Sequence, residues 1–400
     1  MNHSTEKIDI HHMTEKLAYE LRRIPDDPAL LPDQRRTLLR FLSDARTGCL
    51  PGKRAGRKLS DGRCLKIIST IRRFGMYVRV PFEDVTVPQM QEFILGLESG
   101  QVPKLIALGG NVRYTPDTVL DFKKIIRRFY RWLLGDSVPF KDLTYWFDTR
   151  EQPPELRVFD LDTANRLAQQ IGVPQGQALV MGLFDGGFRA GEFFNIRLSD
   201  IRFAPDTDGT LTCFVRVRVS KTKPRTISLP IATEAIRFWI ERHPAGGPLL
   251  TDGTIQAKDP SATLCTWSYA YCRRLLREAG RDEIGERLYF HRFRHASATF
   301  YARHLTEYQM CARYGWTMGS RAVRRYVEAS GILAEDTASI MRRTMAAAPP
   351  RIPMTVQPAP SSFSRPLGVS TVGPIPAGAR PPIRAPPTLT LNSEVDLYDQ

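Results

Sequence analysis

Four segments of this 400-residue chain carry side chains that can bind an anion, move a proton or act as a nucleophile. In chain order, these side chains are those of Arg189, Lys221, His291, Arg294, Trp316 and Tyr326. A guanidinium group donates to two phosphate oxygens at once, and a phenol close to positive charge becomes a better nucleophile. The whole set therefore suits chemistry at a phosphate ester.

Each residue also has a purely structural interpretation when it is taken alone. Arg189 can be a surface charge at a helix end, and Lys221 and Lys223 can be ordinary lysines of a hairpin turn. Tyr326 can be a core aromatic of a short helix. The order and spacing of the complete set favour the functional interpretation over these separate ones.

A metal site is the other chemical interpretation of the histidines. His291 and His295 lie one helical turn apart, as zinc ligands do, but Arg292 stands where the zinc-protease pattern H-E-x-x-H has Glu. The sequence also has no G-x-x-x-x-G-K-[ST] loop and no cluster of acids suited to Mg²⁺. We therefore expect no cofactor and no metal.

In its order, the set resembles the tyrosine recombinase (phage integrase) family, whose members carry Arg, Lys, His-x-x-Arg, His or Trp, and Tyr. All six positions have a counterpart here, within 158–330. Ten residues separate Trp316 from Tyr326, and this spacing is most similar to archaeal integrases and Xer-like recombinases. Glu328 replaces the histidine that usually follows the tyrosine.

The resemblance implies an enzyme that cleaves and rejoins DNA through a 3′-phosphotyrosine bond to Tyr326, without metal or ATP. It implies that Arg189 and Arg294 bind the phosphate. His291 would then act as a hydrogen-bonding group or general base beside the phosphate.

Three further side chains complete the expected site. Trp316 can donate its indole N–H and form a wall of the pocket. Lys221 is the candidate general acid for the leaving 5′-hydroxyl, with Lys223 as the alternative. Glu192 is expected to pair with an arginine or to cap backbone N–H groups.

The resemblance also implies partners and a biological setting. We expect double-stranded DNA as the partner, a homo-tetramer on two DNA sites, and a role in integration or excision of a mobile element or in dimer resolution. A non-catalytic DNA-binding relative and a type IB topoisomerase-like relaxing enzyme remain alternatives.

Composition agrees with a nucleic-acid partner. The net charge is +15, which favours a polyanionic partner, and 42% hydrophobic residues are enough for a real core. No apolar run is long enough to span a bilayer, and the N-terminal residues are charged, so we expect a cytoplasmic protein with no membrane partner. The six cysteines form no C-x-x-C pair and are expected to be free thiols.

The elements that must position these residues follow from periodicity and caps. Helices are expected to begin near Pro32, Ser60, Thr86 and Thr115. The last is the clearest, since Thr115 can cap it, Pro116 fits its first position and Gly135 follows its end. Its basic side is a candidate contact to the DNA backbone and consists of Lys123, Lys124, Arg127, Arg128 and Arg131.

After Arg157 the pattern changes to mixed α/β. Alternation from Leu211 predicts a strand, and TISLP (226–230) a return strand of the same hairpin. Helices are expected near 162–171, 176–185, Arg189, 232–242, 264–279, 291–303 and 306–314, with a short helix around Tyr326.

The predicted fold class is an α-helical core-binding domain (a SAM-like helical bundle) plus a mixed α/β catalytic domain with a small antiparallel sheet. The last 55 residues are Pro-, Ala- and Ser-rich and cannot bury much apolar surface. The predicted order is a polar segment (1–30), the helical DNA-binding domain (31–150) with a linker from about 141 to 157, the catalytic domain (158–345) and a disordered tail (346–400).

Overall fold

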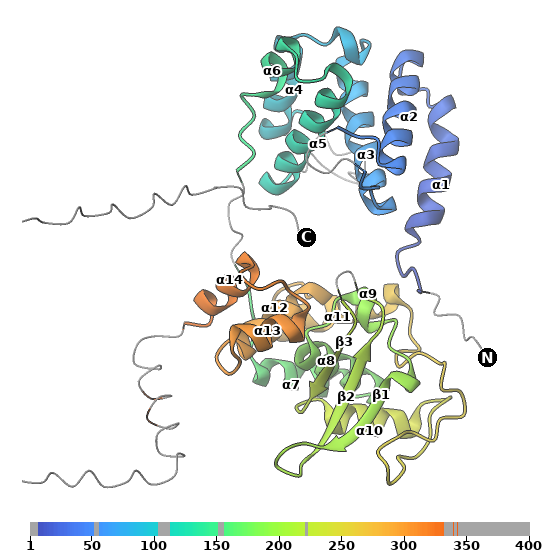
Figure 1. The fold of residues 1–400 in the computed structure, drawn as a ribbon, viewed down its shortest axis with the longest axis vertical. Coiled ribbons are helices and arrows are strands. Elements are labelled where there is room, and N and C mark those ends of the chain that lie inside the picture. The colour runs from blue at the N-terminus through green and yellow to red at the C-terminus, as the bar shows by residue number, and fades with distance from the viewer. Residues whose placement is uncertain are drawn as a thin grey trace, which may run out of the picture. The chain divides into compact units, whose positions relative to one another are not determined.

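A computed structural model describes residues 7–51, 56–102, 113–150, 156–220 and 223–331, together with Ser339 and Arg342. Lys221 and the tail 346–400 lie outside the described residues. No helix within the described ranges combines the length and hydropathy that crossing a membrane requires. The predicted fold class is confirmed, with a helical part and a mixed α/β part around a small antiparallel sheet (Figure 1).

The helical part surrounds one core in which α3 has a central place. Its α-helices are α1 (Met13–Arg23), α2 (Pro32–Thr47), α3 (Asp61–Val78), α4 (Val87–Ser99), α5 (Pro116–Leu134) and α6 (Val138–Thr144). Helix α3 packs against α1, α2, α4 and α5. Buried aromatic rings such as Phe41, Phe74 and Phe129 fill the space between the helices and pack mostly edge to face.

The predicted helix starts are confirmed, and α5 shows why they were predictable. The Thr115 hydroxyl accepts a hydrogen bond from the Thr118 amide, and Pro116 lies in the first turn. Helix α6 falls partly inside the predicted linker. Pro139 lies in the first turn of α6, where a missing N–H costs nothing, and Ser137 caps the helix.

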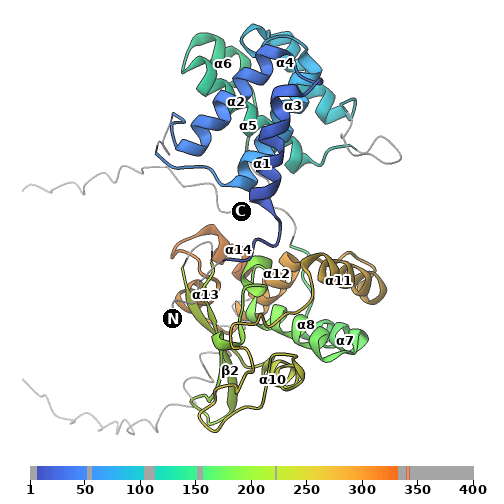
Figure 2. The same cartoon turned by 90° about the vertical axis from the view of Figure 1, so that its right-hand side faces the viewer.

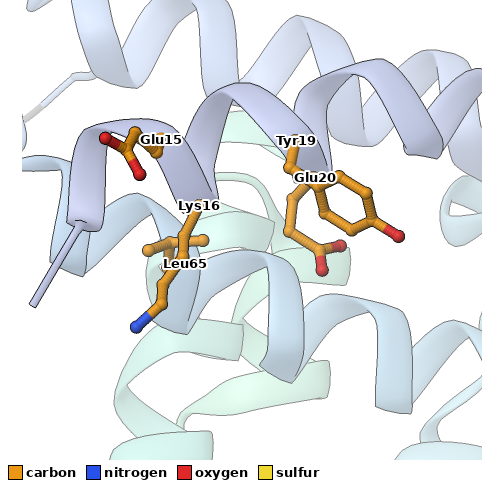
Figure 3. A pocket seen from close by; sticks show the side chains of 5 residues that line it. All are labelled: Glu15, Lys16, Tyr19, Glu20 and Leu65. Carbon is orange, nitrogen blue, oxygen red and sulfur yellow. The ribbon is translucent and has the colours of Figure 1, made fainter.

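Helix α1 lies within the segment expected to be a polar extension. Its Leu17 is buried in the same core as the α2 and α3 residues. An open pocket of about 380 Å³ lies between α1 and α3, lined by Glu15, Lys16, Tyr19, Glu20 and Leu65 (Figure 3). None of the predicted catalytic residues lines this pocket, so it is not the predicted active site.

The α/β part has a three-stranded antiparallel sheet in the order β1-β2-β3. Its strands are β1 (Ile201–Pro205), β2 (Leu211–Val217) and β3 (Arg225–Leu229). Its α-helices are α7 (Leu161–Ile171), α8 (Pro174–Gly186), α9 (Ala190–Phe193), α10 (Thr233–Arg242), α11 (Tyr269–Ile284), α12 (Phe290–Tyr301), α13 (Glu307–Tyr314) and α14 (Arg321–Ala329). Helix α8 is central to this part, since it packs against α7, α10, α12 and β3 (Figures 1 and 2).

In the α/β part, two elements differ from the sequence prediction. Strand β1 was not predicted, because it is short and is defined by pairing with β2, with Ile201 opposite Val215. Helix α11 begins at Tyr269 rather than near 264, because Ser268 caps it through the Tyr271 amide. The cysteines among the described residues are free, and Cys49 alone among them is exposed.

A small separate core joins α12, α13 and α14. Tyr301, Met310, Tyr314, Val323 and Tyr326 are its larger members. Val323 and Tyr326 lie one turn apart on α14 and are the residues by which that helix docks. The helix that carries the predicted nucleophile is therefore held against the helix that carries His291 and Arg294.

Candidate active site

Glu192 links Arg189, at the start of α9, to the hairpin formed by β2 and β3. Its carboxylate accepts hydrogen bonds from Nη1 of Arg189 at 3.0 Å and from Nη1 and Nη2 of Arg225 at 3.0 and 2.9 Å. It also accepts from the Arg189 amide at 3.0 Å and from the Ser220 hydroxyl at 2.9 Å. The expected structural role of Glu192, as arginine partner and helix cap, is confirmed.

Charge compensation keeps Glu192 ionised although it is buried. Burial raises the pKa of its carboxyl, but the hydrogen bonds and charge of Arg225, the Arg189 amide and the Arg294 charge outweigh burial and lower the pKa to about 2. The cluster therefore fixes the direction of the Arg189 side chain, which is about 29% exposed and so remains accessible.

The guanidinium group of Arg294 is held by two backbone carbonyls from separate segments of the chain. Its side chain is about 2% exposed, and it donates to the Gly187 carbonyl at 2.8 Å and to the Tyr314 carbonyl at 2.7 Å. Burial and the Arg189 charge lower the pKa of Arg294 to about 10, so the group stays positively charged at neutral pH. Gly187 has φ of 54°, and a Cβ there would lie 2.4 Å from the Tyr314 ring, so only glycine fits.

Tyr326 lies at the end of an aromatic stack. The Trp316 ring is stacked on Tyr326, with centroids 5.2 Å apart and an interplanar angle of 7°, and also on Tyr314, with centroids 4.7 Å apart. The guanidinium carbon of Arg294 lies 5.4 Å from the centre of the Trp316 ring. Tyr326 is therefore placed by packing and lies close to a buried positive charge.

Burial and several arginines act in opposite directions on the pKa of the Tyr326 phenol. Burial raises the pKa of the phenol, and the charges of Arg294, Arg325 and Arg189 oppose that rise. These cations come from three different segments of the chain. The structure thus brings Arg189, Arg294, Trp316 and Tyr326 of the predicted set to one place.

Both histidines of the H-x-x-R-H motif belong to the same site. The rings of His291 and His295 lie 4.2 Å apart, and Nδ1 of His295 lies 2.6 Å from the Tyr326 hydroxyl oxygen. Partial desolvation of the ring, and then the charges of Arg294, Arg189 and Arg325, lower the pKa of His291 to about 4. His291 is exposed, whereas His295 beside it is half-buried.

The two other tyrosines near this site have structural partners. The Tyr301 hydroxyl donates to the buried carboxylate of Asp185 at 2.5 Å, and the Tyr314 hydroxyl shares a hydrogen bond of 2.8 Å with Ser297. Burial raises the pKa of Tyr314 to about 12 and also raises that of Tyr301. Tyr326 is the one of these three whose hydroxyl lies beside a histidine.

The hairpin that carries the predicted general acid is described only in part. Lys221 lies outside the described residues, but its neighbour Ser220 is bonded to Glu192. Lys223 is exposed. The role of either lysine stays a prediction.

The basic side of α5 is only partly directed outward. Arg127 donates to the carbonyls of Thr144 and Phe147 at 2.9 and 2.7 Å and so closes the end of α6. Nζ of Lys123 lies 2.7 Å from Oε1 of Glu98, and Nε of Arg131 lies 3.2 Å from Oδ1 of Asp136. Lys124 and Arg128 are half-buried.

Two residues of the site were not assigned a role from the sequence. His295 was considered only as a zinc ligand, although its spacing of one turn from His291 already placed both on one helix face. Arg225 lies just before the predicted return strand and was given no role, yet it donates to Glu192 and, through Nε, to the Arg313 carbonyl at 2.7 Å. No local signal distinguishes Arg225 from Lys221 and Lys223, the other cations of the segment 221–225.

Comparison with known proteins gives structural matches alone. No family model and no curated protein matches the chain. A lambda integrase dimer bound to a COC′ core site matches with 14% identity over 73% of this chain and 76% of that chain, at a TM-score of 0.49. XerH site-specific recombinase in a post-cleavage complex matches with 13% identity over 86% of this chain and 100% of that chain, also at 0.49. The Tn1549 transposon integrase matches with 14% identity over 82% of this chain and 98% of that chain, at 0.40. At this distance the likeness assigns no role to any residue.

Proposed function

We propose that this chain is a tyrosine-type site-specific DNA recombinase that acts through a covalent bond between DNA and Tyr326. The observation that carries the proposal is the convergence of Tyr326 with Arg189, Arg294 and Trp316 from separate segments of the chain. Two guanidinium groups beside a phenol suit the negative charge that develops on a phosphate under attack.

In the proposed reaction, the Tyr326 oxygen attacks the scissile phosphorus and the bond to the 5′-oxygen breaks. The products are a 3′-phosphotyrosine and a DNA end with a free 5′-hydroxyl. Arg189 and Arg294 would hold the phosphate oxygens, and such fixed donors typically contribute about 10²–10³-fold each in rate. His291 and Trp316 would donate further hydrogen bonds, and reversal of the step would rejoin the strand.

The test of this function is to trap the covalent product. The protein is incubated with nicked duplexes that carry candidate sites, resolved under denaturing conditions, and the modified peptide is mapped. We expect an adduct on the peptide that contains Tyr326, formed equally well with EDTA because arginines supply the positive charge. An adduct that requires Mg²⁺, or none on any DNA, would contradict the proposal.

We propose Lys221 as the general acid for the leaving 5′-oxygen. Lys221→Ala should slow cleavage of ordinary DNA by about 10²–10⁴-fold, but hardly affect DNA with a 5′-bridging phosphorothiolate, because a sulfur leaving group needs no proton. Lys223→Ala is the matched control and should slow neither substrate much. Equal defects of Lys221→Ala on both substrates would move the role to another group.

We also propose that the helical part contacts the DNA backbone through α5. Affinity for duplex DNA should fall steeply between low and high salt, because bound cations release counterions from DNA. Arg131→Ala should reduce the slope of log affinity against log salt by roughly one if this arginine meets one phosphate. A flat salt response in a filter-binding or anisotropy titration would exclude phosphate contacts as the main source of affinity.

A further inference from the structure

The hydroxyl of Tyr326 has a direct partner that the proposed reaction has not yet used. Nδ1 of His295 lies 2.6 Å from the Tyr326 oxygen, a short distance for a hydrogen bond between a hydroxyl and a ring nitrogen. The two side chains come from α12 and α14, which pack together. Trp316 stacks on the Tyr326 ring and so fixes the phenol in this direction.

The surroundings of His295 determine its charge in this contact. Burial and nearby positive charge lower the pKa of His295 to about 3, so the imidazole is neutral at neutral pH. The groups that act on it are His291, Arg292 and Arg294 from its own helix and Arg325 from α14. In the neutral tautomer that carries its proton on Nε2, Tyr326 donates and Nδ1 of His295 accepts.

We propose that His295 is the group that takes the proton of Tyr326 when DNA is cleaved. This inference rests on the proposed recombinase function. In the step, the Tyr326 oxygen forms a bond to phosphorus while its proton passes to Nδ1 of His295, and the bond from phosphorus to the 5′-oxygen breaks. The leaving oxygen takes a proton from the general acid, so charge and atoms balance.

Bound DNA would make this proton transfer easier. Burial is the main cause of the low pKa of His295, and Arg325 and Arg294, whose charges add to it, lie beside the same phenol that attacks the phosphate. A phosphate anion placed among them offsets their charge, which raises the affinity of His295 for a proton. The base is therefore weak in the free protein and becomes stronger when the substrate is bound.

His291 is less well placed for the same task. It is exposed, and its closest aromatic contact is the ring of His295 rather than that of Tyr326. It lies among the charges of Arg189, Arg294 and Arg325, where a phosphate oxygen would sit. The geometry thus separates the two histidines of the motif: His291 lies among the arginines proposed to bind the phosphate, and His295 contacts the proposed nucleophile.

The first measurement needs no DNA. In the full chain with ¹⁵N-labelled histidine, the His295 ring should be neutral with its proton on Nε2 at neutral pH, and its Nδ1 signal should shift in Tyr326→Phe. His304, an exposed residue after α12, serves as the internal control and should not shift. A protonated His295, or an Nδ1 signal unchanged in Tyr326→Phe, would overturn the proposal.

The second measurement is the rate of adduct formation against pH. His295→Asn keeps an oxygen acceptor near the Nδ1 position but cannot take the proton, so the rate at neutral pH should fall by about 10²–10⁴-fold with DNA affinity retained. Its rate should then rise about tenfold per pH unit, because the phenol must ionise into solvent, whereas the wild-type rate levels off. His304→Asn should behave as wild type.

The outcomes separate this proposal from the proposed function. A wild-type adduct on Tyr326 with His295→Asn equally fast, or with the same pH profile, would overturn the role of His295 alone. Absence of any wild-type adduct would overturn the recombinase function and the proton transfer with it. Retained melting temperature in His295→Asn would show that a rate defect is not a folding defect.

Discussion

Tyr326→Phe should abolish the covalent protein–DNA adduct while leaving the fold and DNA affinity close to wild type. The substitution keeps the ring that stacks on Trp316 and removes the oxygen that contacts His295. Loss of a nucleophile can cost on the order of 10⁶-fold in rate. The lost hydrogen bond should cost only about 1 kcal/mol of unfolding free energy.

The matched control for this experiment is Tyr308→Phe. Tyr308 lies on α13 and is 72% exposed, so the loss of its hydroxyl should change neither stability nor adduct formation. Adducts are resolved on denaturing gels and mapped by mass spectrometry. A covalent complex that persists in Tyr326→Phe, or a modified peptide that contains Tyr314, would assign the nucleophile to another residue.

The sequence predicted those parts of the molecule whose determinants are local. Helix α5 was predictable because its cap, its first-turn proline and its terminal glycine are all adjacent to it. Strand β1 was not, because a five-residue strand is defined by its pairing with β2 rather than by its own pattern. Helix α6 was missed because it has only seven residues and its second half falls inside the segment predicted to be a linker.

The same distinction applies to the site. Six positions were selected because their order along the chain resembles a known family. The structure brings five of them together, and the sixth, Lys221, lies outside the described residues. Pairings across the chain were not predictable. The sequence indicated that Glu192 has an arginine partner, but Arg225 and Arg189 share that carboxylate only after the hairpin and α9 meet. The contact between His295 and Tyr326 likewise depends on how α12 packs against α14.

Glu192→Ala should both destabilise the fold and slow cleavage, because the same carboxylate pairs with the buried Arg225 and directs the Arg189 side chain. Its removal leaves the Arg225 side chain, about 7% exposed, without its counter-charge. Breaking a buried ion pair in this way typically costs about 3–5 kcal/mol of unfolding free energy. Arg189 also loses the partner that directs it, so cleavage should fall by about 10²–10³-fold even under conditions where the variant is folded.

The chain contains a matched control for this substitution. Asp200 accepts from the Arg197 amide at 3.0 Å and pairs with Arg218 at 2.6 Å, so it repeats the cap and the arginine pair of Glu192 without contacting a predicted catalytic residue. Asp200→Ala should therefore lower stability while cleavage stays within a few-fold of wild type. A cleavage rate equally low in both variants would show that Glu192 acts through stability alone.

The pH dependence of stability tests the same carboxylate in a separate way. Because folding lowers the pKa of Glu192 from 4.5 to about 2, the stability that it contributes is fully present above about pH 4.5 and is lost as the pH falls through 2. The difference in unfolding free energy between wild type and Glu192→Ala should therefore be constant at neutral pH and shrink below pH 4.5, as followed by urea denaturation at a series of pH values. A difference that stays the same down to pH 2 would mean that the Glu192 charge does not stabilise the fold, and the hydrogen bonds from Arg225 and Arg189 would then have to act through a neutral carboxyl group.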